Sequence, residues 1–158
     1  MTEQLKTSCI NEGMRRIYDY WESHRKDGRL PRREDIDPSD MTDLLPRIFL
    51  VDVEENPRRY RVRLAGTQVV ACFGVDMTGK TIDSLDLGDD AASILKLYDK
   101  AVDNGEPTYD RHRYWTESYG QHLKYERLLL PLSSDGTHVD KLLGCTFTLP
   151  LKADAPAP

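Results

Sequence analysis

The stretch RRYRVRLAGTQVVACFGVDMTGKTIDSL, residues 58–85, decides the fold of this chain. It begins with strict alternation, in which the apolar Tyr60, Val62 and Leu64 are separated by arginines. Successive side chains of a strand point to opposite faces of a sheet, so the alternation predicts an antiparallel strand with one buried and one solvated face. Gly66 then breaks the pattern and ends the predicted strand.

The apolar residues from Val69 to Phe73 predict a short helix directly after this strand. Gly74 is suited to end that helix, because glycine adopts the left-handed conformation without a steric cost. Met77 to Lys80 then predict a turn. A strand, a short helix and a turn in quick succession are typical of a compact sensor or binding domain, and they leave no obvious place for a catalytic dyad.

An amphipathic helix is predicted upstream, over residues 9–25. Its apolar residues recur at intervals of three and four, which places them on one face: Ile10, Met14, Ile17, Tyr18 and Trp21. Asp37 and Pro38 predict the cap and the first residue of a small second helix. An apolar strand over residues 48–53 then pairs with the strand at Tyr60 as a hairpin.

The downstream half predicts a helix over residues 89–104, followed by three strands over residues 108–115, 122–132 and 139–149. Because hairpins join most of the five strands, we predict an α+β fold, with a five-stranded antiparallel sheet, helices over one face and an N-terminal flanking helix. The predicted organisation is an N-terminal amphipathic helix at 1–28, one sheet domain at 29–151 and a disordered tail at 152–158.

The composition predicts a soluble, cytoplasmic protein. A net charge of −5 over 158 residues argues against general nucleic-acid binding. No segment approaches the ~18 consecutive apolar residues of a membrane span, and the N-terminus lacks the basic and then apolar order of a signal peptide. The three cysteines are widely spaced and form no C-x-x-C motif, which favours reduced thiols.

Short motifs in a fixed order resemble the PAS sensor domain. They are Trp21, Leu30-Pro31, Asp35-Ile36-Asp37-Pro38, Leu44-Leu45-Pro46, Leu50-Val51-Asp52-Val53, Tyr60 to Thr67, Gly74, Thr78-Gly79, Leu129 to Leu132 and Asp135-Gly136. The likeness covers residues 14–149 and is greatest to a family of short, stand-alone bacterial PAS-like proteins of unassigned function. It implies a sheet whose concave face, with helices over it, encloses a small ligand, and it implies no reaction.

In a PAS-like architecture, a ligand is expected between the concave face of the sheet and the helices. The apolar and aromatic residues expected to line that site are Val70, Phe73, Leu95, Tyr98, Tyr125, Cys145 and Phe147. The sequence does not identify the ligand, and it leaves open whether the space is empty or filled by side chains.

Neither haem nor a photochemical flavin is predicted as a cofactor. Some PAS relatives hold haem through a histidine on the helix before the third strand, and residues 89–104 contain no histidine. Light-sensing relatives use a cysteine in an Asn-Cys-Arg-Phe-Leu-Gln signature, whereas Cys72 lies in Val-Val-Ala-Cys-Phe-Gly. Cys72 and Cys145 are therefore interpreted as small buried hydrophobic residues.

No catalytic set or metal site is predicted either. The chain has no Gly-x-Ser-x-Gly elbow, phosphate-binding glycine loop or zinc-binding helix motif. A two-residue hairpin loop at Tyr119-Gly120 would place His112 and His122 on opposite faces of the sheet. The acids near Asp37 are explained by helix capping.

We therefore predict a non-enzymatic sensor or interaction module in bacterial signal transduction, which binds a small ligand or a protein partner. No output segment follows Leu149, so a separate partner would receive the signal. The alternative is a nucleic-acid-binding α+β domain, because basic clusters are interleaved with aromatic residues as on a single-strand platform: Arg32, Arg33, Arg58, Arg59, Arg61, Arg63, Arg111 and Arg113, with Tyr60, Tyr114 and Trp115. The negative net charge favours a solvated face on which arginines pair with acids.

The stripe on the first helix predicts a homodimer. Aromatic side chains bury ~150–250 Å² each, so an uncovered stripe would expose a large apolar patch. PAS domains often pair through flanking helices, and the resemblance implies the same arrangement here. The predicted contact is centred on Met14, Ile17, Tyr18 and Trp21.

Overall fold

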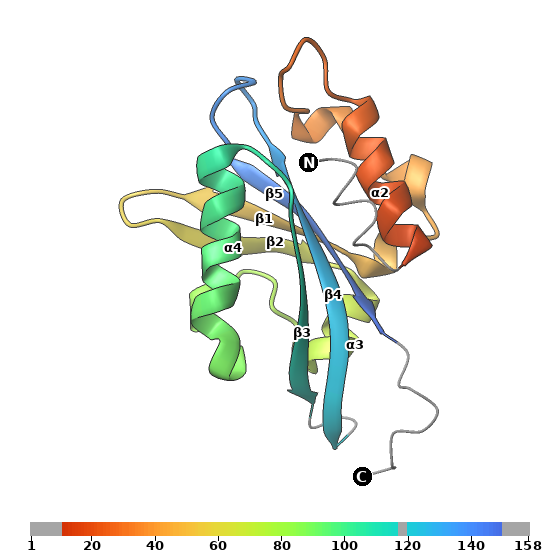
Figure 1. The fold of residues 1–158 in the computed structure, drawn as a ribbon, viewed down its shortest axis with the longest axis vertical. Coiled ribbons are helices and arrows are strands. Elements are labelled where there is room, and N and C mark those ends of the chain that lie inside the picture. The colour runs from red at the N-terminus through yellow and green to blue at the C-terminus, as the bar shows by residue number, and fades with distance from the viewer. Residues whose placement is uncertain (1–10, 117–119, 150–158) are drawn as a thin grey trace.

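A five-stranded antiparallel sheet forms the centre of the computed structural model, which describes residues 11–116 and 120–149 (Figure 1). The strand order is β2-β1-β5-β4-β3, so β1 and β5, the first and last strands in the sequence, are neighbours in the sheet. The strands are β1 (Ile48–Glu54), β2 (Arg59–Ala65), β3 (Thr108–Thr116), β4 (Gln121–Leu132) and β5 (Lys141–Thr148). The predicted α+β fold is confirmed. The tail predicted at 152–158 lies outside the described residues.

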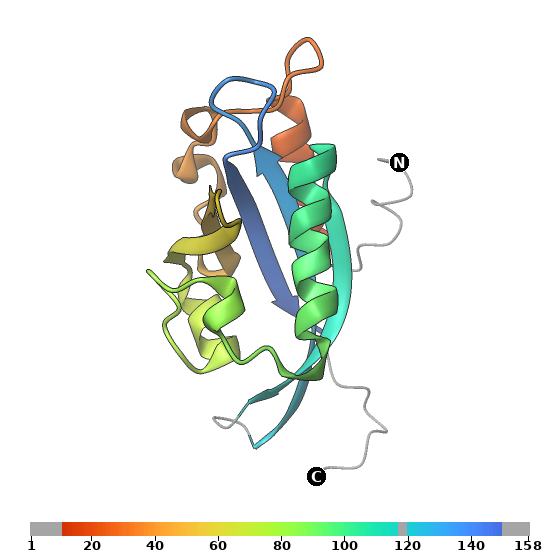
Figure 2. The same cartoon turned by 90° about the vertical axis from the view of Figure 1, so that its left-hand side faces the viewer.

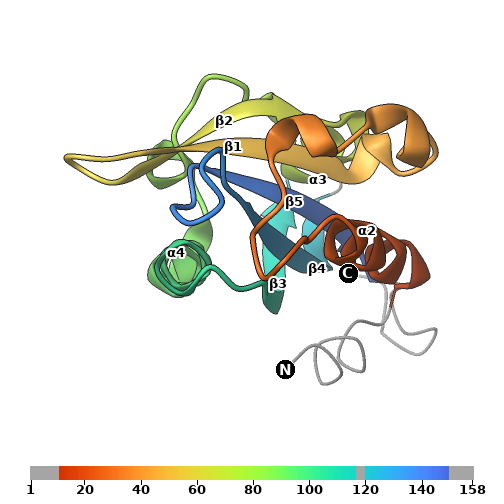
Figure 3. The same cartoon turned by 90° about the horizontal axis from the view of Figure 1, so that it is seen from above.

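Helices cover both faces of this sheet. Seen from above, α2 (Glu12–Ser23) lies on one side of β4 and β5, and α4 (Ala91–Asn104) lies on the other (Figure 3). Figure 2 shows α4 running along the sheet, with the short α3 (Thr67–Phe73) and its following loop at the lower left. Val69 of α3 shares a hydrophobic cluster with Ile94 and Tyr98 of α4. The predicted arrangement of helices over one face therefore describes α3 and α4, while α2 covers the reverse face.

The predicted helix boundaries follow from local chemistry. The Asp37 side chain accepts a hydrogen bond from the Ser39 N–H at 2.9 Å and caps a short 3₁₀ helix, Pro38–Met41. Gly74 ends α3 with a φ of 74° and donates its N–H to the Val70 carbonyl at 2.8 Å. Gly66 precedes α3, where a Cβ would lie 2.4 Å from the Leu45 carbonyl oxygen. Only glycine fits there.

The strand alternation predicted that Leu64 shares the buried face of Val62, and this is wrong, because Leu64 is 41% exposed. A β-bulge separates the two residues, since Leu50 lies opposite Leu64 while Val51 lies opposite Val62. Arg63 is the extra residue in β2. A shift of one residue turns a side chain to the other face, so Leu64 lies on the face of Leu50.

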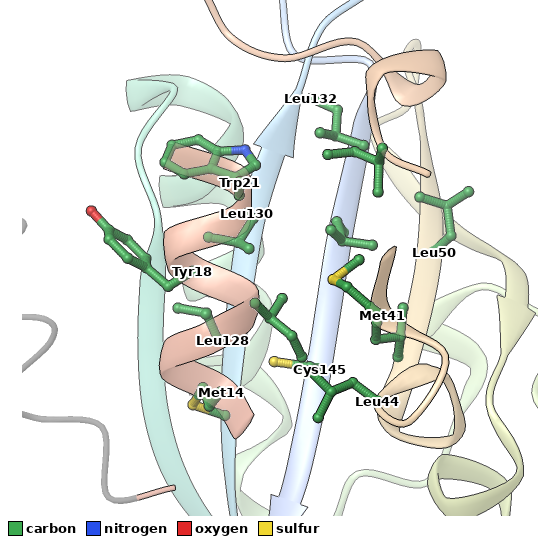
Figure 4. Packing of buried hydrophobic residues seen from close by; sticks show 14 of the residues in the cluster. Met14, Tyr18, Trp21, Met41, Leu44, Leu50, Leu128, Leu130, Leu132 and Cys145 are labelled. Carbon is green, nitrogen blue, oxygen red and sulfur yellow. The ribbon is translucent and has the colours of Figure 1, made fainter. Parts of the chain in front are cut away.

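The apolar stripe of α2 packs on the sheet of the same chain (Figure 4). Met14, Ile17, Tyr18 and Trp21 are only 0–1% exposed, and the Trp21 Nε1–H donates to the Pro131 carbonyl at 2.8 Å. Their neighbours include Leu128, Leu130, Leu132, Met41 and Cys145. The dimer contact predicted for these four residues is therefore not available, because the chain's own core covers the stripe. The homodimer itself stays a prediction without an assigned contact.

Replacing Trp21 by alanine should lower the free energy of unfolding by about 3–5 kcal/mol, because it opens a cavity in the core and leaves the Pro131 carbonyl without its donor. Urea denaturation measures the change. Arg16→Ala is the matched control on the same helix, since it removes only an exposed ion pair with Asp43 and should have a much smaller effect. Equal stability of wild type and Trp21→Ala would contradict this packing.

Candidate functional site

The candidate site is a small cavity between the sheet and the loop and helices that cover its concave face. Its volume is about 20 Å³, which is room for roughly one water molecule. Most of the wall is apolar. The lining residues are Phe49, Val69, Phe73, Met77, Ile82, Leu85, Leu87, Tyr98, Arg127 and Thr146.

Arg127 is the charged residue in this wall. Strand alternation places it there, because Leu128 and Leu130 face α2 and leave Arg127 and Leu129 on the concave face. Arg127 is 3% exposed. A guanidinium buried to this extent needs a charged partner, because removal of its water is costly.

Asp110 supplies that partner from the neighbouring strand. The register of β3 and β4 sets Asp110 directly opposite Arg127. Arg127 donates from Nε to Asp110 Oδ1 at 3.2 Å and from Nη2 to Oδ2 at 2.6 Å. The two parallel hydrogen bonds make a bidentate pair, the strongest geometry between a guanidinium and a carboxylate.

Two tyrosine rings hold the guanidinium in place. The Arg127 Cζ lies 5.5 Å from the centroid of Tyr98, on α4, and 5.9 Å from that of Tyr125, on β4. Burial raises the pKa of Tyr98 to about 12 and also raises the pKa of Tyr125. Both phenols are therefore neutral near pH 7 and add no negative charge to the pair.

His112 connects the Arg127–Asp110 pair to the start of α4. Its Nε2 contacts the Asp110 carboxylate, and its Nδ1 lies 3.5 Å from Oδ2 of Asp90, the residue before α4. The His112 side chain is 11% exposed. We call Arg127, Asp110, His112, Tyr98 and Tyr125 the buried polar cluster.

The structure brings some of the predicted site residues together at this cavity. Phe73 and Tyr98 line it, and the Tyr125 ring meets Phe73 edge-on with 5.6 Å between their centroids. Leu95 is half-buried against the same hydrophobic cluster but does not line the cavity. Val70 is also half-buried and lies outside the lining.

Cys145 and Phe147 do not belong to this site. Both lie in the hydrophobic cluster under α2, on the reverse face of the sheet. On β5, it is Thr146 that faces the cavity. The prediction that Cys145 and Phe147 face the ligand is therefore wrong. The larger apolar residues of β5 face α2, because they pack against Trp21 and its neighbours.

The sequence pattern did not identify Arg127, Asp110 and His112 as site residues. A signal was present, since Arg127 precedes the apolar run Leu128-Leu129-Leu130 and is two residues from Tyr125. A charge within an otherwise apolar strand indicates a buried partner. Identifying that partner requires the register of β3 on β4. The predicted two-residue loop gives a register that differs by two residues from the observed one, so it does not set Asp110 opposite Arg127.

The register observed for β3 and β4 pairs His112 with Tyr125 and Trp115 with His122. The predicted two-residue loop at Tyr119-Gly120 would pair His112 with Arg127, two residues from its observed partner. Because the shift is even, each side chain keeps its face. Within residues 11–116 and 120–149, no group of three or more His, Cys, Asp and Glu side chains is arranged to hold a metal ion. None of the described helices has the length and apolar character needed to cross a bilayer.

Three arginines of the nucleic-acid alternative, on β2 and just before it, are paired with acids. Arg61 contacts Glu54 at 2.8 Å, and Arg63 contacts Asp52 at 2.7 Å. Arg58 contacts Asp103 at 2.6 Å. Tyr60 is buried and its hydroxyl contacts Asp99, so its ring offers no stacking surface. The side chains of Tyr114 and Trp115 lie outside the described residues.

A shallow groove adjoins the cavity through Thr146, which lines both. The groove has a volume of about 200 Å³ and runs between α3 and the end of β5, with Arg47, Gln68 and Cys72 along it. Burial raises the pKa of the Cys72 thiol, so it is protonated near pH 7.

Comparisons with known proteins agree on one architecture. A family model described as a PAS domain matches residues 10–147, a range that includes α2. Comparison with curated proteins finds no match.

Solved structures of low sequence identity share the fold. The LOV protein of Rhodobacter sphaeroides has 19% identity and a TM-score of 0.56, over 75% of this chain and 72% of its own. A PAS domain from Colwellia psychrerythraea has 14% identity and a TM-score of 0.56, over 70% and 95%. The dark structure of the Aureochrome1 LOV photoreceptor has 14% identity and a TM-score of 0.53, over 71% and 81%.

Replacing Arg127 by methionine alone should destabilise the protein by about 3–5 kcal/mol, because Asp110 is left buried without its guanidinium partner. The double variant Arg127→Met/Asp110→Leu should recover most of that loss, since it removes both charges together. Chemical denaturation of wild type, both single variants and the double variant gives the coupling energy. Additive losses would show that the two side chains do not act as a pair.

Proposed function

Because the chain belongs to the PAS domain family, we propose that it is a non-enzymatic sensor module that binds a small molecule in the cavity beside Arg127. The observation that supports this proposal is Arg127, held by the buried polar cluster, in an otherwise mostly apolar cavity wall. A few convergent polar groups in an apolar, concave site are typical of small-molecule recognition.

The energetics of the Arg127–Asp110 pair favour a binding role over a purely structural one. Removing both ions from water costs several kcal/mol per ion, and their attraction repays this only in part. Apolar residues of similar size would stabilise the same fold at least as well. A charged pair at this position is therefore best explained by a ligand that uses it.

Neither a flavin nor a haem fits the site as it stands. The cavity of about 20 Å³ is far below the ~300–1,000 Å³ of ordinary small-molecule sites. Cys72 lines the adjoining groove and not the cavity. The proposed ligand is therefore smaller than either cofactor, and it enters only when a side chain of the lining moves.

The proposed signal passes through α4 to a protein partner. Tyr98 lies on α4 and also lines the cavity, so a bound molecule contacts that helix directly. His112 links the Asp110 carboxylate to Asp90 at the beginning of the same helix. Changes at Arg127 therefore have a short route to the exposed surface of α4.

A fragment screen by ligand-observed NMR tests the proposed function. Fragments that enter the cavity should bind wild type but lose at least ten-fold in affinity to Leu85→Trp, which adds bulk to the lining. Leu95→Trp is the matched control, because Leu95 packs on the same cluster without lining the cavity. If no fragment distinguishes Leu85→Trp from Leu95→Trp, the cavity is not a ligand site.

A further inference from the structure

We infer that the ligand of this site is a small monocarboxylic acid with an apolar body, whose carboxylate binds Arg127. This inference rests on the proposed function and specifies its ligand class. Arg127 lines the cavity, is 3% exposed and is the cationic residue of the lining. Most of the residues around it, including Phe73, Met77 and Ile82, offer apolar surface.

The guanidinium is prepared for a planar anion. Its five N–H donors lie in one fixed plane, and Asp110 takes one from Nε and one from Nη2. The rings of Tyr98 and Tyr125 lie 5.5 and 5.9 Å from its Cζ, which restricts the rotation of the fork. A carboxylate matches the remaining part of this fork in shape and charge.

The charges of the cluster select one negative charge over two. Asp110 already neutralises Arg127, and no lysine or second arginine is among the residues that line the cavity. A dianion such as a phosphate monoester would remain largely uncompensated in this environment. A monoanion can share Arg127 with Asp110, because the His112 Nε2 also contacts Oδ2 of the Asp110 carboxylate, the oxygen that accepts from Arg127 Nη2.

The size of the ligand is set by the side chain of the lining that it must displace. The cavity holds about one water molecule, so a ligand must displace a side chain. Phe73 is suited to move, because it is the last residue of α3, half-buried, and followed by Gly74 in the left-handed conformation. Met77, farther along the same loop, has a flexible side chain. A body about the size of a benzyl or pentyl group replaces the Phe73 ring.

Titration with two acids and their neutral amides tests the inference. Phenylacetate and hexanoate, each against phenylacetamide and hexanamide, are added to ¹⁵N-labelled protein, and the Nε–H resonance of Arg127 is followed by NMR. Both acids should give saturable shifts of this resonance and bind at least ten-fold more tightly than their amides. Phe73→Ala, in which the space of the ring is already free, should bind the acids more tightly than wild type.

The variant Arg127→Met/Asp110→Leu supplies the matched control, since it loses both charges without leaving one unpaired. It should bind acid and amide equally. Equal binding of acid and amide to wild type would overturn the carboxylate assignment. The assignment would also be overturned if neither acid shifted the Arg127 resonance, either in wild type or in Phe73→Ala. The proposed function fails separately, when Leu85→Trp and Leu95→Trp bind every fragment alike.

Discussion

The requirement that both faces of β4 and β5 be buried governs this structure. Neighbouring residues of these strands point to opposite faces, so one face packs against α2 and the other against α4 and the loop after α3. Leu128 and Leu130 therefore lie under Trp21, while Arg127 lies in the wall of the cavity. Because the two faces are one residue apart, a register shift of one would bury Leu128 in the cavity and Arg127 beneath α2.

The second constraint is electrostatic. Arg127 is stable inside the protein only because the β3–β4 register sets Asp110 opposite it and the tyrosine rings flank it. The pair adds little net stability over apolar residues of similar size, since desolvation offsets much of its attraction. The pair places one charged group, the Arg127 guanidinium, in the wall of a mostly apolar cavity. It also connects that cavity through His112 to the beginning of α4.

The stripe on α2 shows how one pattern has two structural solutions. An amphipathic helix beside a small sheet has to cover its apolar face, either on its own domain or on a second copy. Here Trp21 reaches the Pro131 carbonyl and the stripe is covered by the chain's own strands. The helix belongs to the same core as the sheet, and the family match accordingly begins before it.

The sequence by itself determined the α+β class, the five strands, the end of α3 at Gly74 and the cap at Asp37, because these depend on local periodicity and backbone preference. It also indicated Phe73 and Tyr98 as cavity residues. Only the tertiary structure decided that Cys145 and Phe147 lie under α2 and that Arg127 pairs with Asp110. Alternation tells which residues share a face, but which face meets which helix depends on packing between segments far apart in the chain. The bulge at Arg63 and the β3–β4 loop set registers that no local pattern records.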